Sequence, residues 1–177
     1  MERRELIRLA GAAGLAVAVG TTLAVAAPTP AYASQAGWRW CRQCQGLWYA
    51  GNPTTGVCPA NTAGHSFVSS GNYEVFTLWD WDGDQFGWAW CNRCEGLWFW
   101  GNDVPGVCPA GGGHVEEGSD IYKLNKDGGG GQPNWRWCRL CQGLWFAANG
   151  TGGVCPANGT RGHSLSGSGN YYVDVNN

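Results

Sequence analysis

One twelve-residue pattern, W-x-W-C-x-x-C-x-G-L-W-[FY], occurs three times and constrains the fold more than any other feature of this chain. The copies lie at 38–49, 88–99 and 135–146, and the first and third differ at two positions only. Each copy is followed by Gly-Val-Cys-Pro-Ala and then by Gly-His. Self-similarity with a period near fifty residues indicates a tandem array of one supersecondary unit.

Each unit is predicted to form three short antiparallel strands. Alternation in the W-x-W segment places both tryptophans on one face of a strand, and aromatic residues favour strand. The third strand of each unit, which we call the closing strand, is expected at 72–75, 121–124 and 170–173. No stretch after residue 33 keeps an apolar period of 3.6 residues, so helix is not expected. The fold class is therefore predicted to be all-β.

The unit boundaries are expected at 34–78, 79–126 and 127–177. Three units of forty to fifty residues suit either a row of separate modules or a pseudo-threefold, β-trefoil-like closure. The sequence leaves open whether the units share one core.

The cysteines and histidines repeat with the units. In each unit the spacing is Cys-x2-Cys-x13-Cys, and five to seven residues separate the third cysteine from a histidine. These sets use all nine cysteines and all three histidines of the chain. They are Cys41, Cys44, Cys58 and His65; Cys91, Cys94, Cys108 and His114; and Cys138, Cys141, Cys155 and His163.

Three thiolates and one imidazole form a tetrahedral structural zinc shell. Iron also accepts nitrogen and sulfur ligands in this geometry. Disulfides are the main alternative for a secreted protein. However, three cysteines per unit cannot pair within the unit, and disulfides do not explain the repeated histidine. The sequence therefore predicts three structural zinc ions per chain, with Gly46, Gly96 and Gly143 expected to supply the backbone freedom that ends each C-x-x-C turn.

The C-x-x-C-x-G turn with a distal cysteine and histidine resembles zinc ribbons and zinc knuckles. The second half of the unit differs, since zinc ribbons carry a second C-x-x-C there. This resemblance implies small β-modules with closed, non-catalytic zinc sites.

The first 33 residues are predicted to be a cleavable signal peptide. A basic start is followed by an uncharged run at 9–27 and by Ala31-Tyr32-Ala33, an A-x-A site with cleavage expected after Ala33. A membrane anchor is the alternative, because nineteen uncharged residues could span a bilayer. Arg3 and Arg4, within Arg-Arg-Glu-Leu-Ile-Arg, resemble a twin-arginine export signal. That resemblance implies export of an already folded protein to the extracellular space, with no membrane contact after cleavage.

The charge of the predicted mature chain argues against nucleic-acid binding. Residues 34–177 keep eight of the eleven basic and eleven of the thirteen acidic residues, a net charge of −3. A phosphate backbone requires a basic surface, and no basic cluster is present.

No catalytic motif accompanies the predicted metal sites. The four ligands of each unit leave no open position for water, and no histidine remains to act as a general base. A hydrolase is therefore the least favoured function. Asp80-Trp81-Asp82-Gly83-Asp84 has oxygen donors at alternate positions like a calcium loop, but it lacks the glutamate at position twelve. An acidic turn is the preferred interpretation.

The tryptophans suggest a binding function. Nine of the twelve occupy three positions that are repeated in each unit. These nine are expected to fill three small cores and to cover the metal sites. Trp79, Trp81 and Trp100 have no counterparts in the other units. Exposed aromatic rings mark interaction sites, so these three are the candidate ligand-binding residues. We expect a non-enzymatic binding protein for glycans or another cell-surface ligand, or alternatively an adaptor subunit of a secreted protein assembly. The oligomeric state is not predicted.

Overall fold

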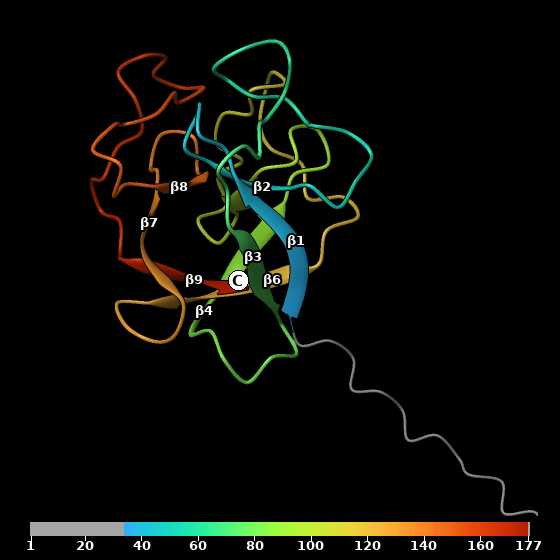
Figure 1. The fold of residues 1–177 in the computed structure, drawn as a ribbon, viewed down its shortest axis with the longest axis vertical. Coiled ribbons are helices and arrows are strands. Elements are labelled where there is room, and N and C mark those ends of the chain that lie inside the picture. Colours follow the sequence, from blue (N-terminus) through green and yellow to red (C-terminus); the bar gives the residue numbers. More distant parts are fainter. Residues whose placement is uncertain (1–33, 177) are drawn as a thin grey trace, which may run out of the picture.

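The computed structural model describes residues 34–176, which form nine β-strands (Figure 1). These strands are β1 (Ser34–Trp40), β2 (Leu47–Tyr49), β3 (Asn72–Thr77), β4 (Gln85–Trp90), β5 (Leu97–Phe99), β6 (Ile121–Lys126), β7 (Gln132–Trp137), β8 (Leu144–Phe146) and β9 (Tyr171–Asn176). The described residues contain no helix, so none that could cross a membrane. The all-β prediction is confirmed. The predicted leader, with Arg3, Arg4 and the cleavage site after Ala33, lies outside the described residues.

Each sequence repeat forms the predicted three-stranded unit. Its first strand pairs antiparallel with the other two, so β1 pairs with β2 and β3, β4 with β5 and β6, and β7 with β8 and β9. We call these units modules 1, 2 and 3. The closing strands β3, β6 and β9 overlap the segments expected from the aromatic pattern.

A bulge bends the first strand of every module at the same place. The register shifts between Ala36 and Trp38, and again at the equivalent positions in β4 and β7. The residues at the bulge, Gly37, Gly87 and Asn134, have φ of 97°, 100° and 75°. Glycine and asparagine tolerate this left-handed conformation best.

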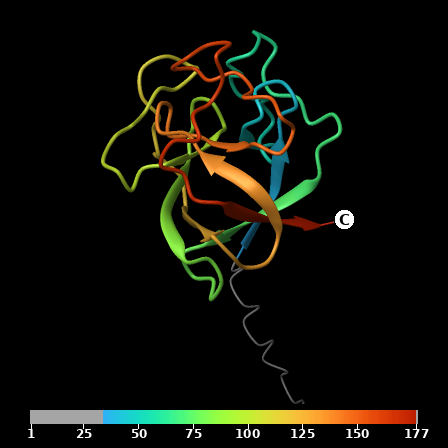
Figure 2. The ribbon, with the colours of Figure 1, turned by 90° about the vertical axis from the view of Figure 1, so that its left-hand side faces the viewer.

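The three modules close on one another around a pseudo-threefold axis. At one end the closing strands form a ring in which β3 pairs with β6, β6 with β9 and β9 with β3. Near the other end the short strands are linked by single bridges, Trp48 to Gly96, Trp98 to Gly143 and Trp145 to Gly46. Figures 1 and 2 show the resulting barrel-like body, with long loops gathered above the sheet. This is the β-trefoil-like closure that the repeat length allowed.

The modules share one hydrophobic core. Its largest members are Trp38, Trp88 and Trp135, which are completely buried. Each of these indoles meets a tyrosine of another module edge-to-face, with ring centroids 5.1–5.3 Å apart, a favoured aromatic geometry. The expectation of three small cores is therefore wrong for these three tryptophans. A module of this size buries too little apolar surface by itself, and its first tryptophan completes a common core instead.

Candidate metal centres

The twelve predicted ligands form three groups of four, one in each module. Within each group the donor atoms all lie within 4.8 Å of one another, and eleven of the twelve residues are buried. The first and third cysteine sulfurs are 3.9 Å apart in every group. The second cysteine sulfur lies 3.4–3.5 Å from the histidine Nδ1. The structure thus brings together every residue that was predicted to bind metal.

These separations fit a tetrahedral metal ion. Bond lengths near 2.3 Å to sulfur and 2.0–2.1 Å to nitrogen place two sulfurs about 3.8 Å apart and sulfur and nitrogen about 3.6 Å apart. A disulfide requires about 2.0 Å between its sulfurs, and all nine cysteines are free thiols. Each group can therefore hold one metal ion, and the disulfide alternative does not fit.

A tight turn positions the first two cysteines of each group. Gln45 donates its backbone N–H to the Cys41 carbonyl over 2.8 Å, and the equivalent bond recurs in the other modules. The glycine after this turn was expected to adopt the left-handed conformation. The structure instead gives that conformation to the residue before the glycine. Gln45, Glu95 and Gln142 have φ of 66–67°. A Cβ at Gly46 would make ordinary contact with the Cys44 sulfur at 3.5 Å, so the space around this position does not explain the glycine.

Two further contacts fix the orientation of the histidine in each group. Its ring stacks on the last tryptophan of the twelve-residue pattern, at 5.2–5.3 Å between centroids and 17–20° between planes. Its Nε2 lies 3.1–3.2 Å from a backbone carbonyl. A hydrogen bond from Nε2–H to a carbonyl leaves Nδ1 free to bind metal, as is usual for metal-bound histidines.

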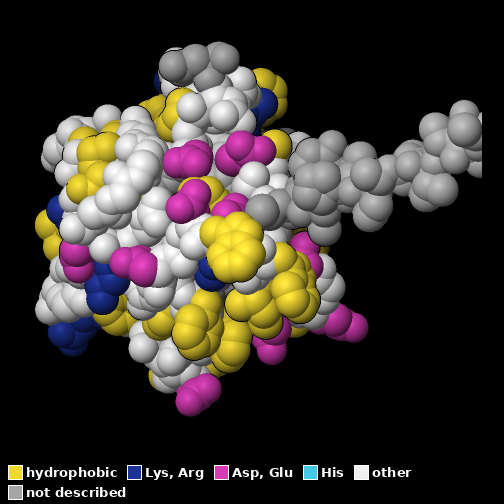
Figure 3. Space-filling model, turned by 90° about the horizontal axis from the view of Figure 1, so that it is seen from below, with side chains coloured by type: hydrophobic (Ala, Val, Ile, Leu, Met, Phe, Trp, Pro, Cys, Tyr) yellow, Lys and Arg dark blue, Asp and Glu magenta, His cyan; other side chains and the backbone are white. Residues whose placement is uncertain are grey.

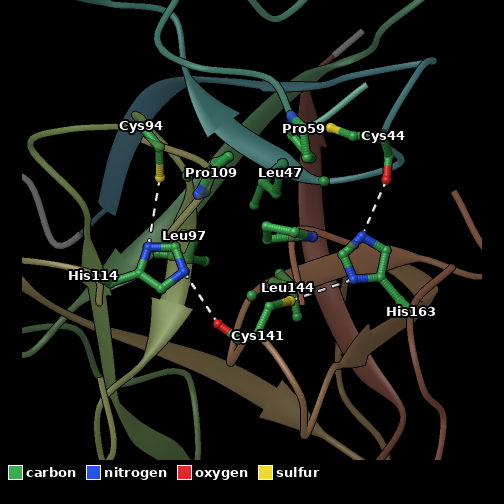
Figure 4. Close-up of a pocket in the computed structure, with 14 residues that line it drawn as sticks. Cys44, Leu47, Pro59, Cys94, Leu97, Pro109, His114, Cys141, Leu144 and His163 are labelled. Atoms are coloured by element: carbon green, nitrogen blue, oxygen red, sulfur yellow. Dashed lines mark hydrogen bonds between the residues drawn. The ribbon is translucent and has the colours of Figure 1, made fainter. Parts of the chain in front are cut away.

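That carbonyl always belongs to the next module. His65 of module 1 contacts the Cys94 carbonyl, His114 contacts that of Cys141, and His163 contacts that of Cys44. Figure 4 shows the two contacts of His114 and His163. The acceptor in each case is the second cysteine of the next candidate metal group. The three metal groups are thus connected in a closed ring.

The glycine of Gly-Val-Cys-Pro-Ala makes the second link of this ring. A Cβ at Gly56 would lie 2.3 Å from the Cys94 carbonyl oxygen, a distance that no side chain can adopt. The same distance separates a Cβ at Gly106 from the Cys141 carbonyl oxygen, and one at Gly153 from that of Cys44. The glycine is therefore needed at this position because the neighbouring module packs directly against its Cα. The sequence alone did not indicate this contact.

Electrostatics within the groups favour binding of a cation. The pKa of Cys41 is far below its usual range, because the Cys44 and Cys58 thiols hydrogen-bond to it. The pKa of Cys44 is raised by its contacts with Cys41 and Cys58 and by burial. Burial lowers the pKa of His65, but the Cys41 and Cys58 sulfurs outweigh this effect and raise it to about 9. These donors thus compete for protons, and a metal cation stabilises their unprotonated forms together.

The three groups surround a small apolar hollow of about 50 Å³ on the pseudo-threefold axis (Figure 4). The hollow is lined by equivalent residues of each module, among them Leu47, Leu97 and Leu144. Its apolar lining and small size agree with a packing gap along the axis.

Among residues 34–176, Glu95 is the one acidic residue that is buried, and the sequence did not single it out for this role. It is only 5 % exposed. It accepts hydrogen bonds from Trp90 Nε1, Asn52 Nδ2 and Thr54 Oγ1 at 2.7–2.8 Å. Two of these donors belong to module 1, so Glu95 joins modules 1 and 2. The equivalent residues Gln45 and Gln142 make the same tryptophan and asparagine contacts.

We expect Glu95→Ala to lower the free energy of unfolding by about 3 kcal/mol, because three donors lose their acceptor in a mostly buried site. Glu95→Gln is the matched control, since glutamine occupies this position in the other modules. It should cost less than about 1.5 kcal/mol, the value of the lost Thr54 bond. Denaturant unfolding measures both variants. Equal stability of the two would contradict this role for Glu95.

The three candidate ligand-binding tryptophans lie in different surroundings. Trp81 is fully exposed and Trp79 is 80 % exposed, both on the loop 78–84 between β3 and β4. Trp100 is half-buried and packs against the cysteines of module 2. Trp79 and Trp100 line two hollows of about 210 and 220 Å³. These hollows have Ser119, Asp120 and Ile121 in common.

The acidic turn Asp80–Asp84 is not among the groups of possible metal ligands found in residues 34–176. Two of its three carboxylates accept hydrogen bonds from backbone N–H groups. Asp80 Oδ1 accepts from Asp82 N–H at 3.0 Å, and Asp84 Oδ1 accepts from Lys126 N–H at 2.8 Å. These contacts agree with an acidic turn and give no support to calcium binding.

Comparisons of this chain with protein-family models, with curated proteins and with solved structures find no match.

Proposed function

We propose that this protein is a secreted, non-enzymatic glycan-binding protein in which three structural zinc ions hold a rigid scaffold. Zinc is the metal that best suits a closed set of three cysteines and one histidine with tetrahedral separations. Four protein donors in each group leave no position for a reacting water, so we assign the ions a structural role. Export through the twin-arginine route would allow the metal to be loaded before the thiols meet an oxidising environment.

The observation that carries the binding function is the exposure of Trp79 and Trp81 on the loop 78–84. Two large indole rings in contact with solvent are unusual on a monomeric surface and indicate a ligand. Asp80, Asp82 and Asp84 alternate with them along the loop. Flat aromatic rings can stack on sugar rings, and neighbouring carboxylates can accept hydrogen bonds from sugar hydroxyl groups.

Hydrogen bonds to β6 fix the loop 78–84, which reduces the entropy lost when it binds a ligand. Lys123 Nζ donates to the Asp80 carbonyl, and Gly83 N–H donates to Asn125 Oδ1 over 3.0 Å. Both partners belong to β6. Figure 3 shows the lower face of the molecule, where hydrophobic and acidic side chains lie side by side.

This proposal predicts that the double variant Trp79→Ala/Trp81→Ala loses at least about tenfold in affinity for a polysaccharide, the equivalent of about 1.4 kcal/mol. Pull-down with insoluble polysaccharides, followed by titration with soluble fragments, measures the loss. Phe67→Ala is the control, because Phe67 is also well exposed (60 %) but lies in a loop of module 1. Binding that is unaffected by the double variant would exclude the loop as the site.

A protein partner is the second candidate, and the aliphatic neighbours of Trp79 favour it. Leu78 and Ile121 are exposed beside this indole, and aromatic residues next to aliphatic ones are typical of protein interfaces. Recovery of the protein from culture fluid in a discrete complex that the double variant no longer forms would support an adaptor role over glycan binding.

A further inference from the structure

A polar hollow of about 220 Å³ lies at the junction of modules 1 and 2. Module 1 contributes residues from β1, β2 and the loop that follows β2, and module 2 contributes residues from β4, β6 and the segment before β6. The side chains that line it are Gln35, Tyr49, Asn52, Trp90, Asp120 and Tyr122. Because both modules are held together by the shared core and by Glu95, this hollow is part of the rigid framework.

Two of the lining residues are found at this junction and not at the other two. Alignment of the repeats places Gly71 and Gly169 at the position of Asp120, and Phe99 and Phe146 at that of Tyr49. The remaining lining side chains have identical counterparts in all three modules. The local backbone is also the same, since Ser119 Oγ donates to the Asp120 carbonyl as its equivalents do to those glycines. The framework therefore does not require the carboxylate or the phenol hydroxyl.

The hydrogen-bonding groups left free in the hollow match those of a sugar. Tyr122 donates its hydroxyl to Gln35 Oε1, which leaves the Gln35 amide N–H groups as donors. Asn52 donates Nδ2 to Glu95, which leaves Asn52 Oδ1 as an acceptor. Asp120 is exposed and adds two carboxylate oxygens. Sugar hydroxyl groups both donate and accept, so they can use this mixed set.

The surroundings also define the size and charge of the ligand. Pockets for drug-sized molecules measure roughly 300–1,000 Å³, so this hollow suits a single ring. Trp90 is half-buried and its Nε1 is bound to Glu95, which fixes the orientation of its indole. Burial, followed by the charge of Asp120, raises the pKa of Tyr122 and keeps its phenol neutral. The carboxylates of Asp120, in the hollow, and of Glu95, which is bound to Asn52 and Trp90 of its lining, disfavour an anionic ligand.

From these observations we infer that the junction of modules 1 and 2 is a binding site for one neutral pyranose ring. Its hydroxyl groups bind Asp120, Asn52 Oδ1 and the Gln35 amide, and the ring lies against the Trp90 indole. This inference rests on the proposed glycan-binding function and adds a second position to it. Asp120 also lines the hollow beside Trp79, so a sugar chain bound in the junction can continue toward the loop 78–84.

The test compares the metal-loaded protein with the double variant Asp120→Gly/Tyr49→Phe. Both substitutions copy the residues of the equivalent positions, so the fold is retained, and thermal melting checks this. The probes are methyl glycosides of neutral hexoses and N-acetylhexosamines, followed by tryptophan fluorescence and by NMR titration. We expect at least one glycoside to bind the wild-type protein with a millimolar Kd, and the double variant to bind it at least tenfold more weakly. Phe67→Ala should bind as the wild type does.

The outcomes separate this inference from the function on which it rests. A wild-type protein that binds polysaccharide but no monosaccharide overturns the junction site and leaves the glycan function intact. Monosaccharide binding that the double variant retains overturns the junction site as well. Absence of binding to both polysaccharides and monosaccharides overturns both proposals. Loss of monosaccharide binding in Asp120→Asn, which keeps the size of the side chain but removes its charge, would further support the carboxylate as a ligand.

Discussion

Removal of the metal ions is expected to unfold all three modules. Each structural zinc site contributes roughly 10–16 kcal/mol of apparent folding free energy, whereas a native domain is stable by only about 5–15 kcal/mol. The clusters around the sites consist largely of cysteines; that of module 1 contains Cys41, Cys44 and Cys58 with Trp48. Without the metal these thiols remain crowded and compete for protons. The framework then lacks the interactions that order the long loops above the sheet.

The measurement is a chelator titration followed by near-ultraviolet circular dichroism and thermal melting. We expect the tryptophan signal and the cooperative transition to disappear, and to return when three equivalents of zinc are added under reducing conditions. The same chelator saturated with zinc is the control. A melting temperature that does not change after complete metal removal, verified by elemental analysis, would show that the metal does not hold the fold.

The substitution His163→Ala is expected to weaken the candidate metal sites of modules 3 and 1, although it removes a ligand only from that of module 3. His163 completes the group of module 3, and its Nε2 contacts the Cys44 carbonyl of module 1. Loss of one ligand should lower the free energy of unfolding by about 5 kcal/mol, roughly half the contribution of a structural zinc site. Because the modules share one core, we expect a single transition at a lower temperature.

His163→Cys separates the two roles of this residue. It retains four ligands, as in zinc sites built from cysteines alone, but it has no donor for the Cys44 carbonyl. Loss of such an outer contact typically costs 10–100-fold in metal affinity. We therefore expect three zinc ions per chain in His163→Cys and fewer in His163→Ala, with module 1 releasing its zinc more readily in both. Independent melting of module 3, with modules 1 and 2 unchanged, would contradict the coupling of the sites.

The ligand sets could be predicted because metal coordination leaves a local pattern. Cys41 and Cys44 must lie in one turn to reach the same ion, so their spacing is fixed by geometry. The third cysteine and the histidine repeat at nearly constant distances because the loop before them is nearly constant in length. The strands followed from the same repeat, since the W-x-W segments and the closing segments alternate in side-chain direction.

The roles of the framework tryptophans were less predictable. All nine are apolar and periodic, so the sequence could not distinguish a common core from three small ones. Trp38 enters the common core, while Trp48, ten residues later, stacks on His65. Trp48 pairs with Arg39 in the β1–β2 register and therefore lies on the opposite face of the sheet from Trp38. The burial of Glu95 could not be predicted either, because its partners Asn52 and Thr54 belong to another module.

The sequence by itself thus determined the three modules, their strands and the four residues of each candidate metal group, because coordination spacing and side-chain alternation act within a single unit. Only the tertiary structure decided how the units depend on one another. The contacts from each histidine and each Gly-Val-Cys-Pro-Ala glycine to the next module end on backbone carbonyls, which every residue carries. The sequence therefore does not show which carbonyl accepts the contact. For the same reason the hollow around Asp120 could be found only after the modules had been brought together.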